Sequence, residues 1–210
     1  NARNRLDANR IEAYIQDTWR FSSKGGHTLF TLNYGIRFSH WNFNKESIVS
    51  PRVSLGVIPA FNHDMTLRFA TGIYYQAPFF KELRDTSTVN GVTVATLRRD
   101  IKSQRSIHFI AGLDYRFTLK KRPYKFTAEA YYKALSNIVP YTVDNVKIVY
   151  DASQQCSGHA MGLDLKLYGE FVPGTDSWVS LSFMDTKIGI NGKSIPLPTD
   201  QRYSLNLFFT

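Results

Sequence analysis

Charged side chains stand in the middle of several alternating stretches of this chain. Asp114, Glu129 and Asp164 each stand in a stretch where polar and apolar residues alternate. Two carboxylates that face one another can act as the general acid and base of a hydrolase. The basic residues that follow them are Arg116, Lys133 and Lys166. Because opposite charges on neighbouring strands contribute roughly 0.2–1 kcal/mol per pair, the pattern favours a ladder of ion pairs over a catalytic dyad.

Other catalytic signatures do not occur in the sequence. It has no phosphate-binding glycine loop, no H-E-x-x-H, no G-x-S-x-G and no dinucleotide fingerprint. The five histidines are scattered, and Cys156 is the only cysteine, so neither an internal disulfide nor a zinc site on cysteine pairs can form. We therefore expect no enzymatic activity, no cofactor and no metal site.

The composition limits the fold class and the partners. Of 210 residues, 43% are hydrophobic and 14% aromatic, and no run approaches the roughly 20 apolar residues of a membrane-spanning helix. The net charge of +9 raises the question of nucleic acid. The basic residues are spread along the chain, however, without a DNA-reading helix, a zinc-finger spacing or an RNA-binding aromatic motif, so we expect no nucleic-acid partner. A soluble all-β protein or a transmembrane barrel remains.

The dominant period of the hydrophobic pattern is two, which is typical of strands. From 106 to 117 every second residue is apolar, beginning at Ile107 and ending at Phe117. The other alternating segments are 11–21 (interrupted by Asp17), 125–134 and 161–171, with weaker ones at 28–42, 51–60, 66–77, 178–189 and 201–210. Strands of ten or more residues exceed the ~5–6 residues usual in soluble sheets and suit a tilted strand that crosses a bilayer. We expect about nine long up-and-down strands.

Short and long connections alternate between these segments. The short ones are Ser22–His27, Phe61–Met65, Lys120–Tyr124 and Val172–Ser177. The long ones are Phe43–Ser50, Pro78–Ser103, Val139–Ser157 and Gly189–Asp200. Outer-membrane barrels have short periplasmic turns and longer extracellular loops, so the alternation favours a transmembrane barrel over a sandwich or a propeller.

The longest connection contains two local signals. Phe79–Asp85 predicts one helical turn with Pro78 at its first position. Val89–Val92 reads Val-Asn-Gly-Val, which predicts the tip of a small hairpin on a type I′ turn. A loop of this length can carry function or can simply cover the surface.

Aromatic residues gather near the ends of the predicted strands. The lower group is Trp19, Phe21, Phe61, Tyr115, Phe117, Tyr124, Phe126, Phe171 and Trp178. The upper group is Trp41, Phe43, Tyr75, Phe79 and Tyr132. Aromatic rings favour the headgroup level of a membrane, so we expect two girdles, with ordinary packing at strand ends as the alternative.

Several strands carry motifs that resemble those of TonB-dependent outer-membrane receptors. The matching stretches are Tyr14–Trp19 (YIQDTW), Leu32–Phe38 (LNYGIRF), Ser50–Leu55 (SPRVSL), Gly72–Pro78 (GIYYQAP), Glu129–Lys133 (EAYYK) and Gly162–Asp164 (GLD). Asp164 stands where these receptors usually carry glutamate, which keeps the charge. The order and spacing of the motifs are similar to the Bacteroidetes branch of that family across almost the whole chain.

The resemblance implies an all-β fold, an antiparallel transmembrane β-barrel segment in the bacterial outer membrane. Residues 1–210 would supply about nine strands of a barrel of about 22, and the plug, the TonB-contacting segment and the closing strands would lie outside them. The implied activity is the import of a scarce ligand such as a siderophore, haem, a vitamin, a glycan or a peptide. The implied partners are outer-membrane lipid and lipopolysaccharide, the plug of the parent chain, TonB, and a small-molecule or oligomeric cargo.

The same topology suggests ligand contacts at the upper, inward-facing positions. These are Tyr74, Gln76, His108, Tyr131 and Lys133. Aromatic and hydrogen-bonding groups that converge at a mouth suit a ligand site. Contact with the plug is the alternative role for these residues. An adhesin, an interaction platform or a soluble all-β binding module is the alternative function for the chain.

Overall fold

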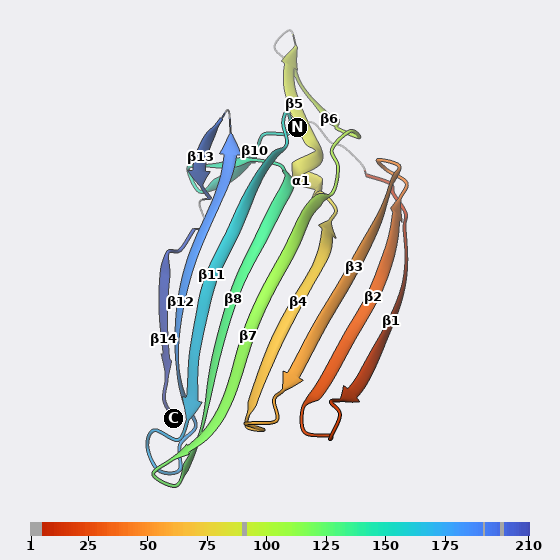
Figure 1. Ribbon diagram of the computed structural model, residues 1–210. Helices are drawn as coiled ribbons and strands as arrows, with labels where there is room; N and C mark the ends of the chain where they lie inside the picture. The colour runs from red at the N-terminus through yellow and green to blue at the C-terminus, as the bar shows by residue number, and fades with distance from the viewer. Residues whose placement is uncertain (1–5, 90–91, 191, 198–199) are drawn as a thin grey trace.

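The computed structural model describes residues 6–89, 92–190, 192–197 and 200–210. Within them, long antiparallel strands lie side by side in one twisted sheet (Figure 1). In spatial order the first eight are β1 (Arg10–Ser22), β2 (Leu29–Trp41), β3 (Glu46–Ile58), β4 (Met65–Gln76), β7 (Gln104–Leu119), β8 (Arg122–Ile138), β11 (Cys156–Gly169) and β12 (Ser177–Ile190). The prediction of an all-β, antiparallel, up-and-down fold is confirmed.

The ninth position of the sheet is shared by two short strands. β13 (Lys193–Pro196) pairs with the upper end of β12, and β14 (Tyr203–Phe208) pairs with its lower end. Among the described residues the sheet therefore has nine strand positions, as the sequence predicted. The sheet is open, with β1 at one edge and β13 and β14 at the other.

One of the four connections predicted to be long is short, because β3 already begins at Glu46, which pairs with Trp41. The connection from β12 to β14 is long, as predicted, and contains β13. The sequence prediction started the third strand at Pro51 and assigned the residues before it to a connection. Here β3 pairs with β4 only over Arg52–Val57, so the missing N–H of Pro51 removes no ladder bond on that side. The strand extends upward past the proline, paired with β2 alone.

The other two long connections carry structure of their own at the upper end of the sheet (Figure 1). The first contains α1 (Phe80–Leu83), β5 (Arg84–Val89) and β6 (Val92–Leu97), and the second contains β9 (Tyr141–Asp144) and β10 (Lys147–Tyr150). The predicted helical turn and hairpin are both present. Phe79 is the helix N-cap, so Pro78 precedes the cap instead of occupying the first helical position. Asn90 and Gly91, and with them the predicted turn type, lie outside the described residues.

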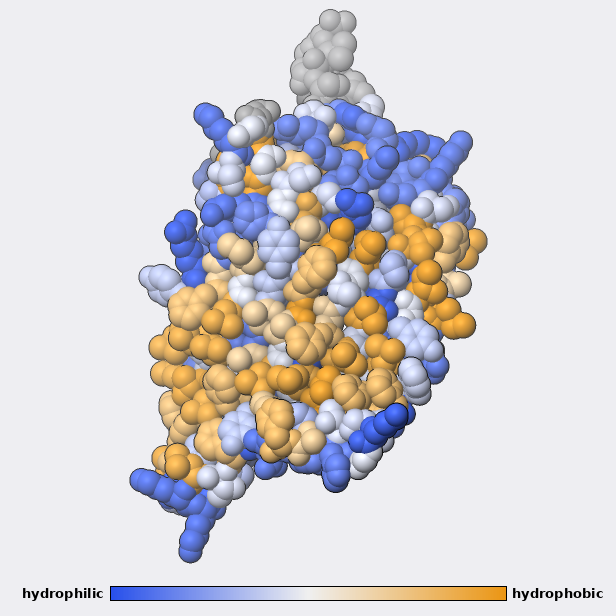
Figure 2. Space-filling model, in the orientation of Figure 1, coloured by the Kyte–Doolittle hydropathy of each residue, from blue (hydrophilic) through white to orange (hydrophobic). Residues whose placement is uncertain are grey.

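The two faces of the sheet differ in chemistry, and its rows can be followed through the register. One row on the outer face joins Leu67, Leu113, Ala128, Leu165, Leu181 and Leu205. The adjacent row on the inner face joins Thr66, Asp114, Thr127, Lys166, Ser180 and Asn206. Figure 2 shows a broad hydrophobic band across the face toward the viewer, with hydrophilic residues at both ends. Such a band is what the lipid-facing side of a membrane barrel requires.

Asp17, which interrupts the apolar pattern of β1, has a partner on the same face. It pairs in register with Tyr34 of β2, whose hydroxyl donates a hydrogen bond of 3.0 Å to Asp17 Oδ2. The carboxylate is therefore accommodated by a neighbouring hydroxyl without a change of strand register.

The lower aromatic group forms contacts across several strands. Phe117 stacks between Tyr115 and Tyr124, with ring centroids 5.6 and 5.5 Å away, and Tyr124 contacts Phe171 at 5.7 Å. Trp178 departs from the prediction because it lies on the inner face, where Lys166 Nζ is 4.5 Å from its ring centroid.

Two residues of the predicted upper girdle instead belong to a buried core. Trp41 and Phe43 are buried with Leu83, Ile101, Val139 and Ala152. This core joins the upper end of β2 to the two structured connections, residues 77–103 and 139–155, which we call the loop cap. No helix in the described part of the chain is long and apolar enough to cross a membrane.

Candidate functional site

The candidate residues lie on neighbouring rows of the inner face. Arg52 pairs with Gly72, Gly72 with His108, and His108 with Lys133, so four strands bring these residues into line. Tyr74 stands two residues above Gly72 on β4. Its ring stacks on His108, with the centroids 4.2 Å apart and the planes 25° from parallel.

Arg52 completes this group, although sequence reasoning did not select it. Its guanidinium carbon lies 4.3 Å from the centroid of the Tyr74 ring. A Cβ on Gly72 would stand 3.0 Å from Arg52 Cγ and 3.2 Å from Tyr74 Cε2. The bare backbone of Gly72 therefore gives the arginine stem and the ring the space in which they meet. The stretch Gly72–Pro78, already noted as a motif, was the signal that could have revealed this.

Tyr131 and Lys133 form the second half of the site on β8. Lys133 Nζ lies 4.9 Å from the Tyr131 ring centroid. Tyr131 pairs with Gly162 of β11, and a Cβ on that glycine would be 2.5 Å from the tyrosine hydroxyl oxygen. The ring thus lies across a glycine of the next strand, an arrangement known to cover glycine backbone in sheets.

Gln76 stands one row higher than Tyr74 and is exposed. It pairs in register with Gln104 of β7. Tyr74, Gln76 and His108 line a hollow of about 420 Å³ beneath the loop cap, and Glu82 and Tyr150 of the cap line it as well. Tyr131 and Lys133 do not line this hollow. The structure therefore brings Tyr74, His108 and Lys133 together, with Tyr131 beside Lys133 and Gln76 at the upper edge.

A second hollow of about 550 Å³ lies beside the first, over β1 to β4. Its lining includes Tyr14, Arg37, Arg52, Ser54 and Tyr74. Tyr74 belongs to both hollows, so the Arg52–Tyr74–His108 stack stands between them.

Two carboxylates, Glu82 and Glu46, attach the loop cap to the wall. Glu82 is almost fully buried, and its oxygens accept hydrogen bonds from Phe79 N–H at 2.8 Å and Gln104 Nε2 at 2.9 Å. Burial raises the pKa of the Glu82 carboxyl, while the two hydrogen bonds oppose that shift. Glu46 at the start of β3 accepts hydrogen bonds from both the N–H and the hydroxyl of Ser103.

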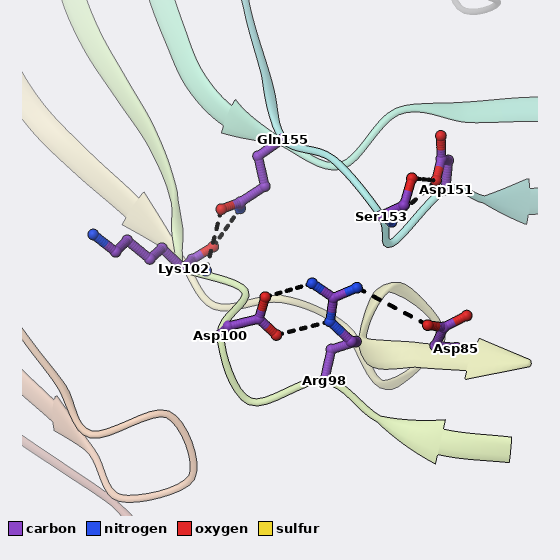
Figure 3. Close-up of polar contacts among 7 residues, drawn as sticks. All are labelled: Asp85, Arg98, Asp100, Lys102, Asp151, Ser153 and Gln155. Carbon is purple, nitrogen blue, oxygen red and sulfur yellow. Dashed lines mark hydrogen bonds and ion pairs between the residues drawn. The ribbon is translucent and has the colours of Figure 1, made fainter.

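Exposed polar contacts fasten the base of the β5–β6 hairpin (Figure 3). Arg98 Nε donates to Asp100 Oδ1 at 2.8 Å, and its Nη1 lies 3.9 Å from Asp85 Oδ2. The Arg98 hydrogen bonds lower the pKa of Asp100 to about 2. Gln155 joins the two halves of the cap by donating to the carbonyl of Lys102 at 3.0 Å and accepting from its N–H at 3.4 Å.

The carboxylates that could have formed a catalytic pair are engaged by cations lower on the inner face. Asp114 lies 3.0 Å from Arg68 and 3.4 Å from Lys125, and Glu129 lies 3.6 Å from Arg68. Ion pairs are present as predicted, but the cations are Arg68 and Lys125 instead of Arg116, Lys133 and Lys166. Cross-strand register selects them, because Arg68 and Glu129 both pair with Gly112.

The candidate residues around Tyr74 and His108 are suited to binding a ligand. They offer ring faces, two cations and an imidazole, which bind a ligand through stacking, charge and hydrogen bonds. Within the described ranges, no three His, Cys, Asp or Glu side chains gather as a metal site.

Comparison with known proteins identifies the family to which the chain belongs. The sequence matches the family described as TonB dependent receptor-like, beta-barrel, over residues 1–210. The comparison with curated proteins gave no match. Because the family match spans the whole sequence and agrees with the long up-and-down strands, the chain belongs to the β-barrel family of the TonB-dependent outer-membrane receptors.

Proposed function

We propose that this chain forms part of the barrel wall of a receptor that imports a scarce ligand through the bacterial outer membrane. The cargo would be a siderophore, haem, a vitamin, a glycan or a peptide, taken up with a plug from the same parent chain and with energy relayed by TonB. In this proposal Tyr74, His108, Tyr131 and Lys133 contact the cargo as it passes the upper end of the wall, and Gln76 contacts it at the edge of the mouth.

The observation that carries the proposal is the stack of Tyr74 on His108 beside two hollows under the loop cap. Rings that are already stacked lose little conformational freedom when a ligand binds, so their binding surface is preorganised. The loops above the site offer groups that could contact the same cargo, since Glu82 and Tyr150 line the upper hollow.

The test is uptake by the full-length parent receptor carrying Tyr74→Ala with Lys133→Ala. Growth would be measured with each cargo class as the sole source of the nutrient that it supplies. These are iron from a ferric siderophore or from haem, the vitamin cobalamin, and carbon from a glycan or a peptide. We expect loss of growth on the cargo that the unmodified receptor supports, with the receptor present at its usual surface level.

The matched control is Tyr168→Ala with Lys166→Ala, which removes the same residue types from the lower end of the same face. Uptake should persist in this control. Undiminished uptake in the Tyr74 and Lys133 variant would remove these residues from the cargo path. A parent receptor that supports no cargo uptake at all would count against the import function itself.

A further inference from the structure

Three cations on the upper inner face lie on tyrosine rings. They are Arg37 over Tyr14, Arg52 over Tyr74, and Lys133 over Tyr131, at 5.8, 4.3 and 4.9 Å from the ring centroids. Among the residues that the structure describes, none of the three forms an ion pair with a carboxylate. We call these three cations and their three rings the cation–tyrosine stripe.

The lower part of the same face is arranged differently. There Arg68 and Lys125 share Asp114, and Arg68 also reaches Glu129. Positive charge is thus neutralised around Asp114. Among the described residues, Lys166 also lies on the lower wall over the Trp178 ring without an ion pair, whereas three such cations gather on the upper face. An uncompensated group of like charges in a partly enclosed space attracts counter-charged ligands from solution.

Three carboxylates near the upper end of the stripe are held by other groups, and Asp164 and Glu129 lie near Tyr131 at its lower end. Glu12 accepts a hydrogen bond of 3.3 Å from the hydroxyl of Ser39. Glu46 is bound to Ser103, and Glu82 to Phe79 and Gln104. Each of these three acids has donors of its own in the wall or the cap. Arg37 and Arg52 both line the hollow over β1 to β4, and they also line a smaller one with Glu12 and Glu46.

The stripe is also a built feature of the sheet. Gly72 leaves room for the contact between Arg52 and Tyr74, and Gly162 leaves room for the Tyr131 ring. A ring beneath a cation holds the charge in place through its π face, and the N–H groups that do not point at the ring stay available as donors.

We propose that the cation–tyrosine stripe binds the anionic part of the cargo, a group of several carboxylates or phosphates. Arginine suits this role because its planar fork donates two parallel hydrogen bonds to a carboxylate or a phosphate. The inference rests on the proposed function, since it names the chemical class of what the receptor carries. The competing occupant is an acidic surface of the parent chain's plug, which would already fill the stripe in the intact receptor.

The experiment uses the full-length parent receptor, plug included, in detergent micelles, with tripolyphosphate as the probe. Calorimetric titration of the unmodified receptor should show binding that weakens as sodium chloride is raised, because salt screens exposed charges. Arg52→Gln with Lys133→Gln should weaken that binding roughly tenfold or more, since two charge-assisted contacts are lost.

Two control variants make the result specific. Lys125→Gln with Lys166→Gln removes the same net charge from the lower wall and should leave tripolyphosphate affinity unchanged. The charge-conserving Arg52→Lys with Lys133→Arg should retain most of the binding, which separates lost charge from lost fold. Maltohexaose, a neutral oligosaccharide, should give no signal that depends on Arg52 or Lys133.

Absence of tripolyphosphate binding by the unmodified receptor would overturn the inference and would favour the plug as the occupant of the stripe. An equal loss in the lower-wall control would overturn it too, because binding would then follow net charge alone. Either result leaves the import function standing, since uptake of cargo is measured independently of this titration.

Discussion

Arg68 Nε lies 3.0 Å from Asp114 Oδ2, and the guanidinium reaches this position by crossing the backbone of Gly112 on the neighbouring strand. The contact is an ion pair without the geometry of a hydrogen bond at Nε. It joins β4 to β7 on the inner face, and Glu129 extends it to β8 at 3.6 Å. The missing side chain at Gly112 thus leaves room for Arg68 to pair with the carboxylates of Asp114 and Glu129 on the inner face.

Gly112→Ala should disturb this group of charges, and Gly56→Ala provides the matched comparison. Both glycines pair with Arg68, but a Cβ would stand 3.2 Å from the guanidinium at Gly112 and would meet nothing nearer than 3.9 Å at Gly56. Both variants share the backbone benefit of alanine, roughly 0.5–1 kcal/mol. We expect Gly112→Ala to be the less stable by up to about 1 kcal/mol, the value of a partly exposed ion pair.

The measurement is the urea midpoint for unfolding of the full-length receptor, followed by the loss of its heat-modifiable band. Adding Asp114→Asn and Glu129→Gln to both variants should remove the difference, because both ion pairs of Arg68 are then already absent. Equal midpoints for the two single variants would show that Arg68 adapts without cost.

The faces and lengths of the strands could be predicted because a period of two places residues on one face whatever the strand pairs with. The residues that pair across neighbouring strands could not be predicted in this way. The cations opposite Asp114 and Glu129 depend on register between β4, β7 and β8, and short-range spacing pointed to Arg116 and Lys133 instead. Whether Pro51 removes a backbone hydrogen bond likewise depends on where the pairing of β3 with β4 ends, which the sequence of β3 alone does not determine.

The candidate site was predictable in part for the same reason. Tyr74, His108, Tyr131 and Lys133 follow from alternation and from nearness to a long loop. Arg52 is separated from them by a turn and half a strand, so it joins the group only through the contact across Gly72. Trp41 and Phe43 were assigned to a membrane girdle because aromatic type alone does not distinguish a lipid-facing ring from one covered by a loop cap.

Leu165→Arg should impair assembly far more than Lys166→Leu. Leu165 belongs to the leucine-rich outer row, and a charge at the midplane of the bilayer costs roughly 2–4 kcal/mol there. Lys166 faces inward over the Trp178 ring, a contact of about 0.5–1 kcal/mol. The folded fraction in isolated outer membranes, measured by heat modifiability, distinguishes the two. Similar losses in both variants would contradict the assignment of faces.

Cysteine labelling should reveal which end of the sheet faces the outside. Val146, in the turn between β9 and β10, is 93% exposed, and Phe61, in the turn between β3 and β4, is 81% exposed. A membrane-impermeant maleimide added to intact cells should label Val146→Cys and should leave Phe61→Cys unlabelled until the outer membrane is opened. Cys156 is buried and should contribute little background. Labelling of Phe61→Cys alone on intact cells would reverse the orientation.

The packing of the loop cap should weaken as pH rises, because Glu82 is buried at its centre. Burial raises the pKa of this carboxyl above its ordinary value of 4.5, so the closed cap binds more protons than the open one. The stabilising contribution of the protonated form is complete below that ordinary value and is lost as pH rises through the raised one. Hydrogen exchange of residues 77–103, corrected for intrinsic pH effects, should therefore show greater protection at the acidic end of this range than above it.

Glu82→Gln should abolish this pH dependence, since glutamine does not titrate. His108 lines the same hollow and can titrate within the same range, so a pH slope that survives in Glu82→Gln would assign the effect to His108 or another group and contradict the prediction. Asp100→Asn is the control that should keep the slope. Its hydrogen bonds to Arg98 hold the Asp100 pKa at about 2, below the range examined, so removing that carboxylate should loosen the hairpin base equally at every pH tested.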